Sequence, residues 1–299
     1  MADPFPILSL QADSPELIEQ LGSKPKFWFR MTDDEQPWLF KFARERTGEH
    51  WAEKIAAEVA VLIGVPAARV ELAEFGNKCG SASRSFVRQE SGFDLVHGDE
   101  LLAGHVIGYD RSKVFRQSSH SISNIVKVME TVFTDVETRD VQLTRFAGFM
   151  VLDALIGNTD RHHQNWGILR RTLANGAIEL ELAPSFDHAS SLGRNIPIDE
   201  RERRLKECTV LGYAKKGRGG IYWSASDKKG ANPLDLAMRA AHNWPGYFRP
   251  WLLRLQQVAD QEFSAIVDRI PPEWMDAVQK EFCVSLLFST SSELKKLPL

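Results

Sequence analysis

The sequence predicts an α+β protein with two parts, a strand-rich first segment and a longer helical segment. Two observations lead to this fold class. Short aromatic runs at 26–31 and 37–43 flank a polar turn at 32–35, which is the pattern of a β-hairpin. Beyond about residue 92, apolar residues recur mostly with a helical period. We therefore expect two domains, at residues 1–90 and 91–299.

The remaining elements follow from periodicity and from chain-breaking residues. Apolar residues from Trp51 to Ile63 repeat with a 3.6-residue period, so a helix is expected over 49–63 that ends at Gly64. A second strand pair is expected at 69–73 and 84–88. The second part is expected to contain helices at 122–133, 141–156, 233–242, 251–270 and 272–287.

One hairpin is expected to interrupt the helical part. Short strand-like runs at 166–171 and 177–182 flank Asn175 and Gly176, a strong signal for a type I′ turn. The polar stretch NTDRHHQN precedes this hairpin and the stretch APSFDHASS follows it. The two stretches richest in side chains that could take part in catalysis are therefore predicted to lie at the two ends of the hairpin.

Three side chains around the hairpin could form one site, namely Asp160, Asn165 and Asp187. Carboxylates that lie close together repel one another, and a divalent cation is the usual means of neutralising them. Mg²⁺ takes few protein oxygens and completes its shell with water and phosphate oxygens. Asn165 and Asp187 suit that role, and Asp160 could orient or deprotonate an attacking hydroxyl in phosphoryl transfer. Alternatively, the three residues could only cap a turn, start a strand and cap a helix.

The segments GNTDRHHQNWGIL and LAPSFDHASSLG resemble the catalytic and metal-binding segments of the HipA-like serine/threonine kinases. The pattern D-R-H-x-x-N also resembles the catalytic loop of phosphatidylinositol kinases. The resemblance implies a two-lobed protein-kinase-like fold that uses ATP and Mg²⁺. It further implies that Asp160 and His162 are catalytic and that Asn165 and Asp187 bind the metal.

The same resemblance assigns roles in the first part of the chain. Lys41, in the strand PWLFKFA, is expected to reach the ATP phosphates and to pair with Glu58 on the following helix. Glu53 competes for that pairing, and both partners could instead be ordinary surface residues. The expected phosphate loop and adenine hinge supply the remaining ATP-binding candidates: Gly22, Ser23, Lys24, Lys26, Phe86, Val87 and Arg88.

Two departures from the family pattern are visible. Only about twenty residues precede the expected phosphate loop, so the chain resembles compact members that lack an additional N-terminal subdomain. The family often places an autophosphorylated serine just before this loop, where this sequence has Glu19 and Leu21. Because neither residue carries a hydroxyl, that form of regulation is not expected, and Ser23, inside the loop, is the only nearby hydroxyl.

The function implied by the resemblance is transfer of the γ-phosphoryl group to serine or threonine of a protein substrate. A role as a toxin opposed by an antitoxin partner is also implied. A phosphoinositide or small-molecule kinase is the first alternative, because D-R-H-x-x-N occurs there as well. A catalytically weak nucleotide-binding module and a nucleic-acid-binding regulator are the others. Retention of Lys41, Asp160, Asn165 and Asp187 argues against a module without activity.

Composition narrows the possible partners and the compartment. The net charge is −3 and the pI is about 6.3, so no general attraction to nucleic acid or to a membrane surface is expected. Cys79, Cys208 and Cys283 form no C-x-x-C pair, which disfavours a structural zinc site and a disulfide framework. No signal peptide or membrane-spanning segment is recognisable. A cytoplasmic location is therefore expected.

Overall fold

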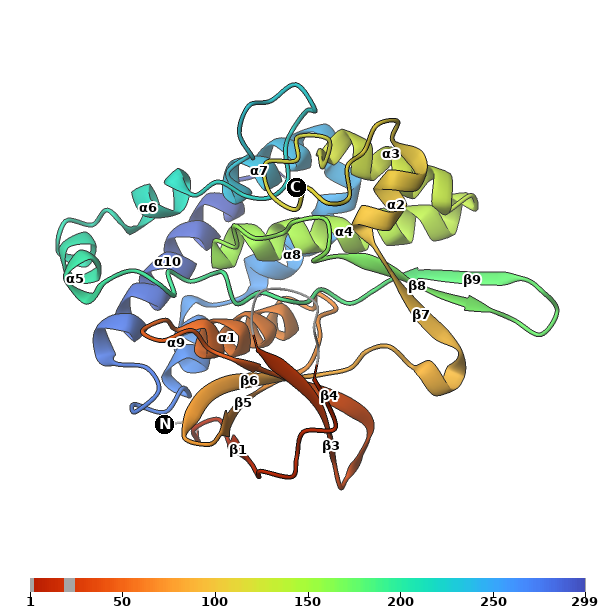
Figure 1. Cartoon of the computed structure of the whole chain (residues 1–299). Coiled ribbons are helices and arrows are strands. Elements are labelled where there is room, and N and C mark those ends of the chain that lie inside the picture. Colours follow the sequence, from red (N-terminus) through yellow and green to blue (C-terminus); the bar gives the residue numbers. More distant parts are fainter. Residues whose placement is uncertain (1–2, 19–24, 299) are drawn as a thin grey trace.

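The first part of the chain folds into a six-stranded sheet with the order β1-β5-β6-β4-β3-β2 (Figure 1). The computed structural model describes residues 3–18 and 25–298. Strands β1 and β5 pair in parallel, and the other neighbours are antiparallel. The strands are β1 (Ile7–Leu10), β2 (Leu17–Ile18), β3 (Lys26–Met31), β4 (Asp34–Phe42), β5 (Val70–Phe75) and β6 (Lys78–Arg84).

The predicted hairpin of β3 and β4 is confirmed, and its register places Lys26 opposite Lys41. The second strand of the other predicted pair is misplaced, because β6 ends at Arg84 instead of covering 84–88. The reason is the turn between β5 and β6. Gly76 and Asn77 both have positive φ, so the chain reverses within two residues and the partner strand begins at once.

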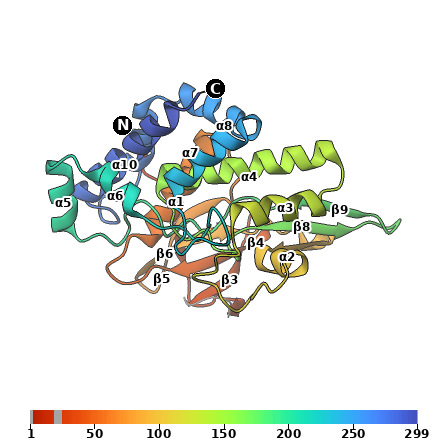
Figure 2. The same cartoon turned by 90° about the horizontal axis from the view of Figure 1, so that it is seen from above.

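Helix α1 (Glu49–Leu62) packs on strands β5 and β6 and also touches the helices of the second part (Figures 1 and 2). Gly64 follows it with φ +71°, a left-handed conformation that terminates helices and suits glycine. Apolar residues of α1 belong to the same buried cluster as those of the C-terminal helices. The helix thus joins the sheet to the rest of the molecule.

The second part combines a small sheet with nine helices within residues 25–298. The predicted hairpin is confirmed as β8 (Gly167–Thr172) and β9 (Ile178–Leu182). The predicted type I′ turn is wrong, because Gly176 has positive φ and Asn175 does not, and that turn requires it at both residues. Strand β7 (Phe93–His97), which the sequence analysis missed, pairs with β8. The helices are α2 (Gly98–His105), α3 (Ile122–Val132), α4 (Val136–Ile156), α5 (Ile198–Lys206), α6 (Val210–Lys216), α7 (Pro233–Asn243), α8 (Pro245–Gln257), α9 (Asp260–Asp268) and α10 (Ala277–Lys295).

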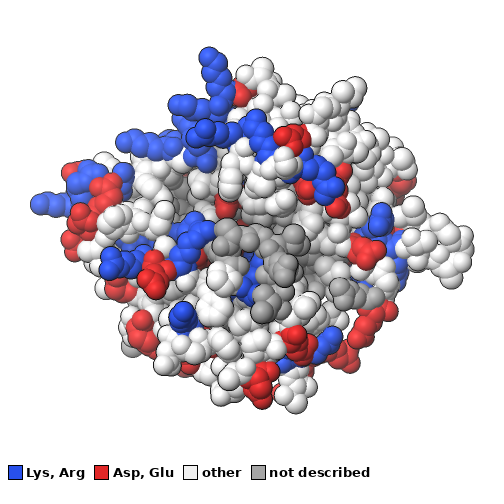
Figure 3. All heavy atoms as spheres, in the orientation of Figure 1, with Lys and Arg blue, Asp and Glu red and all other residues white. Residues whose placement is uncertain are grey.

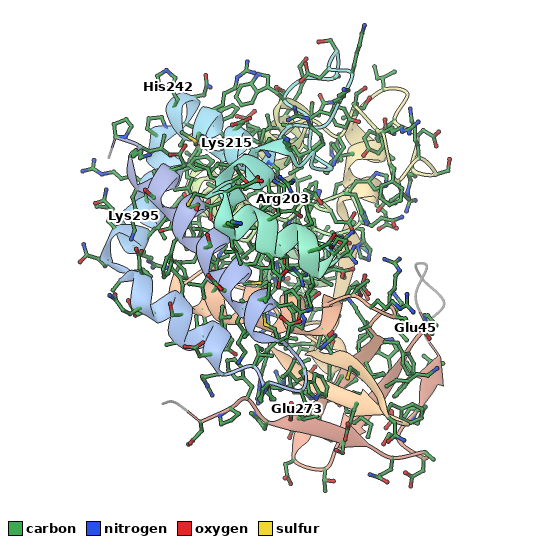
Figure 4. All side chains as sticks on the ribbon, turned by 90° about the vertical axis from the view of Figure 1, so that its left-hand side faces the viewer. Glu45, Arg203, Lys215, His242, Glu273 and Lys295 are labelled. Carbon is green, nitrogen blue, oxygen red and sulfur yellow. The ribbon has the colours of Figure 1, made fainter. Side chains whose placement is uncertain are left out.

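Helix boundaries differ from the expected ones where caps or extended residues intervene. The expected helix over 251–270 is two helices, because Val258 adopts an extended conformation between α8 and α9. Helix α4 starts earlier than expected, since the Asp135 side chain accepts the Thr138 N–H and caps its first turn. Helices α5 and α6 were not predicted, and both pack on α10 (Figure 4).

The long helix α4 runs through the middle of the helical part, and the chain continues from its end through a polar loop into the hairpin (Figure 1). Its second half is almost entirely buried, and it packs against α7, α8 and α10. No helix in the described part of the chain combines the length and apolar character that crossing a membrane requires. The division of the chain at residue 90 remains a prediction, although β6, the last strand of the first sheet, ends shortly before it.

Candidate active site

The polar loop, residues 158–165, begins where α4 ends. Gly157 has φ +64° and closes the helix. Within the loop, Asn158 Oδ1 accepts the Asp160 N–H at 3.0 Å. The carbonyl oxygen of Asp160 accepts from His162 N at 2.7 Å and from Asn165 Nδ2 at 2.8 Å. These hydrogen bonds fold the loop into a tight turn that orients the Asp160 side chain.

The return segment, residues 183–191, follows β9 and lies against the polar loop. Ser190 Oγ donates to Asp160 Oδ2 at 3.0 Å, and Arg161 Nη1 donates to the carbonyl oxygens of Asn165 at 2.8 Å and Phe186 at 3.5 Å. Asp187 has φ +59°, a left-handed conformation that aspartate tolerates better than most residues. The hairpin thus brings the segments of Asp160, Asn165 and Asp187 together, as their order around it suggested.

Lys41 reaches this site from the first sheet. Its Nζ lies 3.1 Å from Asp187 Oδ1, with the Lys41 side chain 14% exposed and the Asp187 side chain 37% exposed. Burial by itself would lower the pKa of Lys41, but the charges of Asp187 and Glu53 raise it overall. The ammonium group is therefore held in its charged form beside the carboxylate expected to bind a metal.

The expected pairing of Lys41 with Glu58 is wrong. Glu58 accepts from Lys54 Nζ at 2.7 Å, and Lys54 also donates to Glu71 at 2.9 Å. The glutamates of α1 that act on Lys41 electrostatically are Glu53 and, with a smaller effect, Glu49. Glu53 and Glu58 are five positions apart, so they lie about 140° apart around the helix axis, and of these two only Glu53 acts on Lys41.

Glu53 is 1% exposed and connects the first part of the chain to the return segment. Its Oε1 accepts the backbone N–H of His188 at 2.8 Å. Its Oε2 is buried without a hydrogen-bond partner among the described residues. Burial would raise the pKa of Glu53, yet the contacts with His188 and the charge of Lys41 lower it overall. The carboxylate is therefore held ionised inside the protein.

Asp153 and Arg161 form a buried ion pair that the sequence analysis missed. Arg161 donates to both Asp153 oxygens at 2.8 Å, and Asn158 donates to the same carboxylate at 2.7 Å. Arg161 also donates to Ser185 Oγ at 2.8 Å, whose hydroxyl lies 2.6 Å from His188 Nε2. An aspartate in the most apolar turns of α4 was the available signal, because buried carboxylates require partners.

Of the ATP-binding candidates, Gly22, Ser23 and Lys24 lie outside the described residues, and Lys26 begins β3. Phe86 and Val87 pack against an apolar cluster formed by Phe93, Leu169 and Ala183, and the Arg88 guanidinium lies 4.5 Å from the centre of the Phe93 ring. Phe86 lies 5.3 Å from the Phe186 ring, Val87 N donates to Ser85 Oγ at 3.2 Å, and Arg88 pairs with Glu181 at 3.0 Å.

His162 is anchored within the polar loop, since its Nδ1 accepts the Gln164 N–H at 3.2 Å. Burial lowers its pKa against the opposing effect of Asp160 and Asp187. Its ring lies 5.9 Å from that of Phe115. Within the described residues the Asp160 carboxylate accepts from Ser190, and no hydrogen bond joins it to the His162 ring.

The donor atoms fit Mg²⁺. The amide nitrogen of Asn165 donates to the Asp160 carbonyl oxygen, so its carboxamide oxygen would be the atom that faces a metal. Asp187 would contribute a carboxylate oxygen, and both are hard ligands of the kind Mg²⁺ prefers. No group of three or more His, Cys, Asp or Glu with a metal-binding arrangement occurs within residues 3–18 and 25–298.

The first sheet carries a lysine on a strand and is covered by a helix that carries a glutamate. The helical part beside it contains a D-x-x-x-x-N loop and an aspartate that follows a hairpin. This combination defines a protein-kinase-like fold. The chain belongs to the HipA-like C-terminal domain family, whose model matches residues 19–243. Both the expected fold class and the resemblance are confirmed, and membership of the family supports a kinase-like function.

Solved structures agree with this fold. The proinflammatory kinase CtkA of Helicobacter pylori matches with a TM-score of 0.75 and 20% identity, over 98% of this chain and 96% of that chain. HipA from a complex with HipB and operator DNA of Shewanella oneidensis MR-1 matches with a TM-score of 0.59 and 13% identity, over 95% of this chain and 68% of that chain. No curated protein matched the sequence.

Proposed function

We propose that this protein is an ATP- and Mg²⁺-dependent kinase that phosphorylates serine or threonine side chains of a protein. One observation carries the proposal. Lys41 from the first sheet lies 3.1 Å from Asp187, beside the loop that carries Asp160 and Asn165. A lysine, two carboxylates and a carboxamide are the protein groups that phosphoryl transfer requires. The choice of serine or threonine as acceptor rests on the family.

Each of these residues then has one task. Asn165 and Asp187 would hold Mg²⁺, and the bound ion would neutralise charge on the phosphates. Lys41 leaves Asp187 to contact the phosphates, and Glu53 keeps its ammonium group in place. Asp160, oriented by Ser190 and by the hydrogen bonds of its own loop, accepts a hydrogen bond from the acceptor hydroxyl. Precise orientation of this kind contributes much of the rate in phosphoryl transfer.

The acceptor oxygen bonds to the γ-phosphorus of ATP while the bond from that phosphorus to the bridging oxygen breaks. The hydroxyl proton passes to Asp160 and then to solvent, and ADP leaves. Residues Phe86, Val87 and Arg88 would lie behind the adenine, where the buried cluster of Phe93, Leu169 and Ala183 provides an apolar surface.

The biological setting is a second part of the proposal. The solved HipA structure contains HipB and operator DNA, so we propose a toxin-like role with an antitoxin as partner. The three cysteines are free thiols, which agrees with a reducing cytoplasm. Expression of the protein in cells with and without a co-expressed candidate antitoxin would test this role, and equal growth in both cases would argue against it.

The central experiment is incubation of the purified protein with γ-labelled ATP, Mg²⁺ and a cell lysate, followed by identification of the labelled molecules. The matched control is Asp160→Ala, which should fold normally and bind ATP but transfer phosphate about 10²- to 10⁴-fold more slowly. Acid hydrolysis of the labelled proteins should release phosphoserine or phosphothreonine. Label found only in lipids or small molecules would contradict a protein acceptor, and equal labelling by Asp160→Ala would remove Asp160 from the reaction.

A further inference from the structure

Two loops, residues 106–120 and 215–232, the second counted from the last two residues of α6, lie directly against the polar loop, and we call them together the collar. In the first, the Tyr109 hydroxyl lies 2.7 Å from His163 Nδ1. In the second, the Gly220 backbone is so close that an added Cβ would lie 2.8 Å from the Arg161 carbonyl oxygen and 2.9 Å from His162 N. The collar therefore borders the loop that carries Asp160.

The two loops of the collar are also joined to each other. Tyr222 N donates to the His120 carbonyl oxygen at 3.0 Å, and Ile122 N donates to the Tyr222 carbonyl oxygen at 2.8 Å. His120 Nδ1 lies 2.8 Å from the Gly220 carbonyl oxygen. Backbone and side-chain hydrogen bonds thus make one continuous surface from segments that lie about one hundred residues apart in the sequence.

This surface has a charge opposite to that of the whole chain. The collar contains eight Lys or Arg and two Asp, Asp110 and Asp227, for a net charge of +6, whereas the chain carries −3. Figure 3 shows Lys and Arg gathered along the upper edge of the molecule, where Figure 1 draws the loop that precedes α7. A concentration of one sign of charge attracts ligands of the other sign.

Most of these basic side chains have no ionic partner. Arg111 pairs with Asp99 and Glu100, and Lys215, labelled in Figure 4, pairs with Glu293. The other six are exposed and form no ion pair with any carboxylate of residues 3–18 and 25–298: Lys113, Arg116, Lys216, Arg218, Lys228 and Lys229. Their charge is available to a ligand.

We propose that the collar binds an acidic polypeptide segment next to the acceptor hydroxyl, so that the enzyme selects serine or threonine flanked by Asp and Glu. This inference rests on the proposed function, which places the acceptor beside Asp160. Two exposed apolar side chains on the same surface, Ile107 and Phe115, suit a polypeptide with mixed side chains. Phe115 contacts the ring of His162, so the apolar contact reaches the polar loop itself.

The test uses peptides that contain one serine and differ only in their flanks: Asp and Glu, the isosteric Asn and Gln, or Lys and Arg. The double variant Lys228→Glu/Lys229→Glu reverses two exposed charges of the collar. The matched control, Lys78→Glu/Arg249→Glu, makes the same change of charge at exposed positions on β6 and α8. None of these residues contacts Asp160, Asn165, Asp187 or Lys41 in the described structure.

We expect kcat/KM for the acidic peptide to exceed that for the isosteric peptide by about tenfold at low salt, since several exposed ion pairs with small individual contributions act together. The collar variant should lose this preference through KM, with the KM for ATP unchanged, and the control should keep it. Added salt should weaken the preference, because it screens exposed charges. Equal use of the three peptides by the wild type would overturn the inference and leave the proposed kinase activity intact.

Binding measured by fluorescence anisotropy separates the two proposals. The acidic peptide could bind to the wild type but not to the collar variant, while neither protein transfers phosphate. That result would support the docking surface and count against the kinase activity. Labelled single-stranded RNA serves as the competing ligand. If RNA binds through the collar and displaces an acidic peptide that binds only weakly, the surface recognises nucleic acid and the inference is wrong.

Discussion

Two clusters of charge contact or include residues of the return segment, and they differ in their hydrogen bonds. In the first, Arg161 donates to both oxygens of Asp153, and Asn158 donates to the same carboxylate. In the second, Lys41 contacts Asp187, and Glu53 keeps one oxygen, Oε2, without a hydrogen-bond partner in the described structure. The first cluster is closed and the second is open.

The two clusters also differ in the solvent exposure of their side chains and in their backbone conformation. Asp153 and Arg161 are 4% and 2% exposed, whereas the Asp187 side chain is 37% exposed and its φ is +59°. A closed cluster suits a scaffold, because every charge has its partner and rearrangement would be costly. An open cluster with an unusual backbone conformation suits a site that must exchange partners. Stability and activity should therefore respond differently to substitutions in the two clusters.

The largest effect is expected from Asp153→Ala, which leaves the Arg161 charge buried without its carboxylate. We expect a loss of about 3–5 kcal/mol in the free energy of unfolding, measured by urea denaturation. The double variant Asp153→Leu/Arg161→Met should recover part of this loss, because no buried charge then remains unpaired. It should nevertheless be inactive, since Arg161 also holds the Asn165 carbonyl. A loss below about 1 kcal/mol for Asp153→Ala would show that the cluster is not a scaffold.

Next in size are Lys41→Met and the isosteric Glu53→Gln in the open cluster. Each should lower the rate of phosphate transfer by roughly 100-fold, and the double variant should lose little more, because Glu53 acts through the position of Lys41. Both single variants should unfold at urea concentrations near that of the wild type. Losses that multiply in the double variant would show that the two residues act independently.

A smaller effect is expected from Asp187→Asn, which removes a charge and keeps a side chain that tolerates positive φ. Affinity for ATP in the presence of Mg²⁺ should fall by about tenfold or more, as changes around metal sites commonly cause. Affinity without Mg²⁺ should stay similar or rise, because a negative charge near the phosphates is gone. Calorimetry with and without Mg²⁺ measures both values. A variant that binds Mg-ATP as the wild type does would assign Asp187 to structure alone.

The smallest effect is expected from Glu58→Gln. Its partner Lys54 retains Glu71 and the Val70 carbonyl, so the loss of stability should stay below about 1 kcal/mol. Activity should be unchanged, in contrast to Glu53→Gln on the same helix. Inactivation by Glu58→Gln with no effect of Glu53→Gln would restore the pairing that the resemblance first implied.

Local patterns were sufficient to predict much of the site. Asn175 and Gly176 predicted the β8–β9 hairpin, and the hairpin predicted that Asp160 and Asn165 would lie beside the segment of Asp187. Turn residues encode their conformation within a few positions, so no distant contact is needed for that inference. The break between α8 and α9 was missed, because Val258 resembles a helical core residue and only its surroundings make it extended.

The sequence by itself determined which kinds of residue surround the hairpin and hence the class of chemistry. Only the tertiary structure decided which glutamate serves Lys41, because that choice depends on the rotation of α1 against the sheet. It also decided that Asp153 and Arg161 form a buried pair and that loops about one hundred residues apart form one basic surface. Contacts between distant segments are set by packing in three dimensions, and no local period in the sequence encodes them.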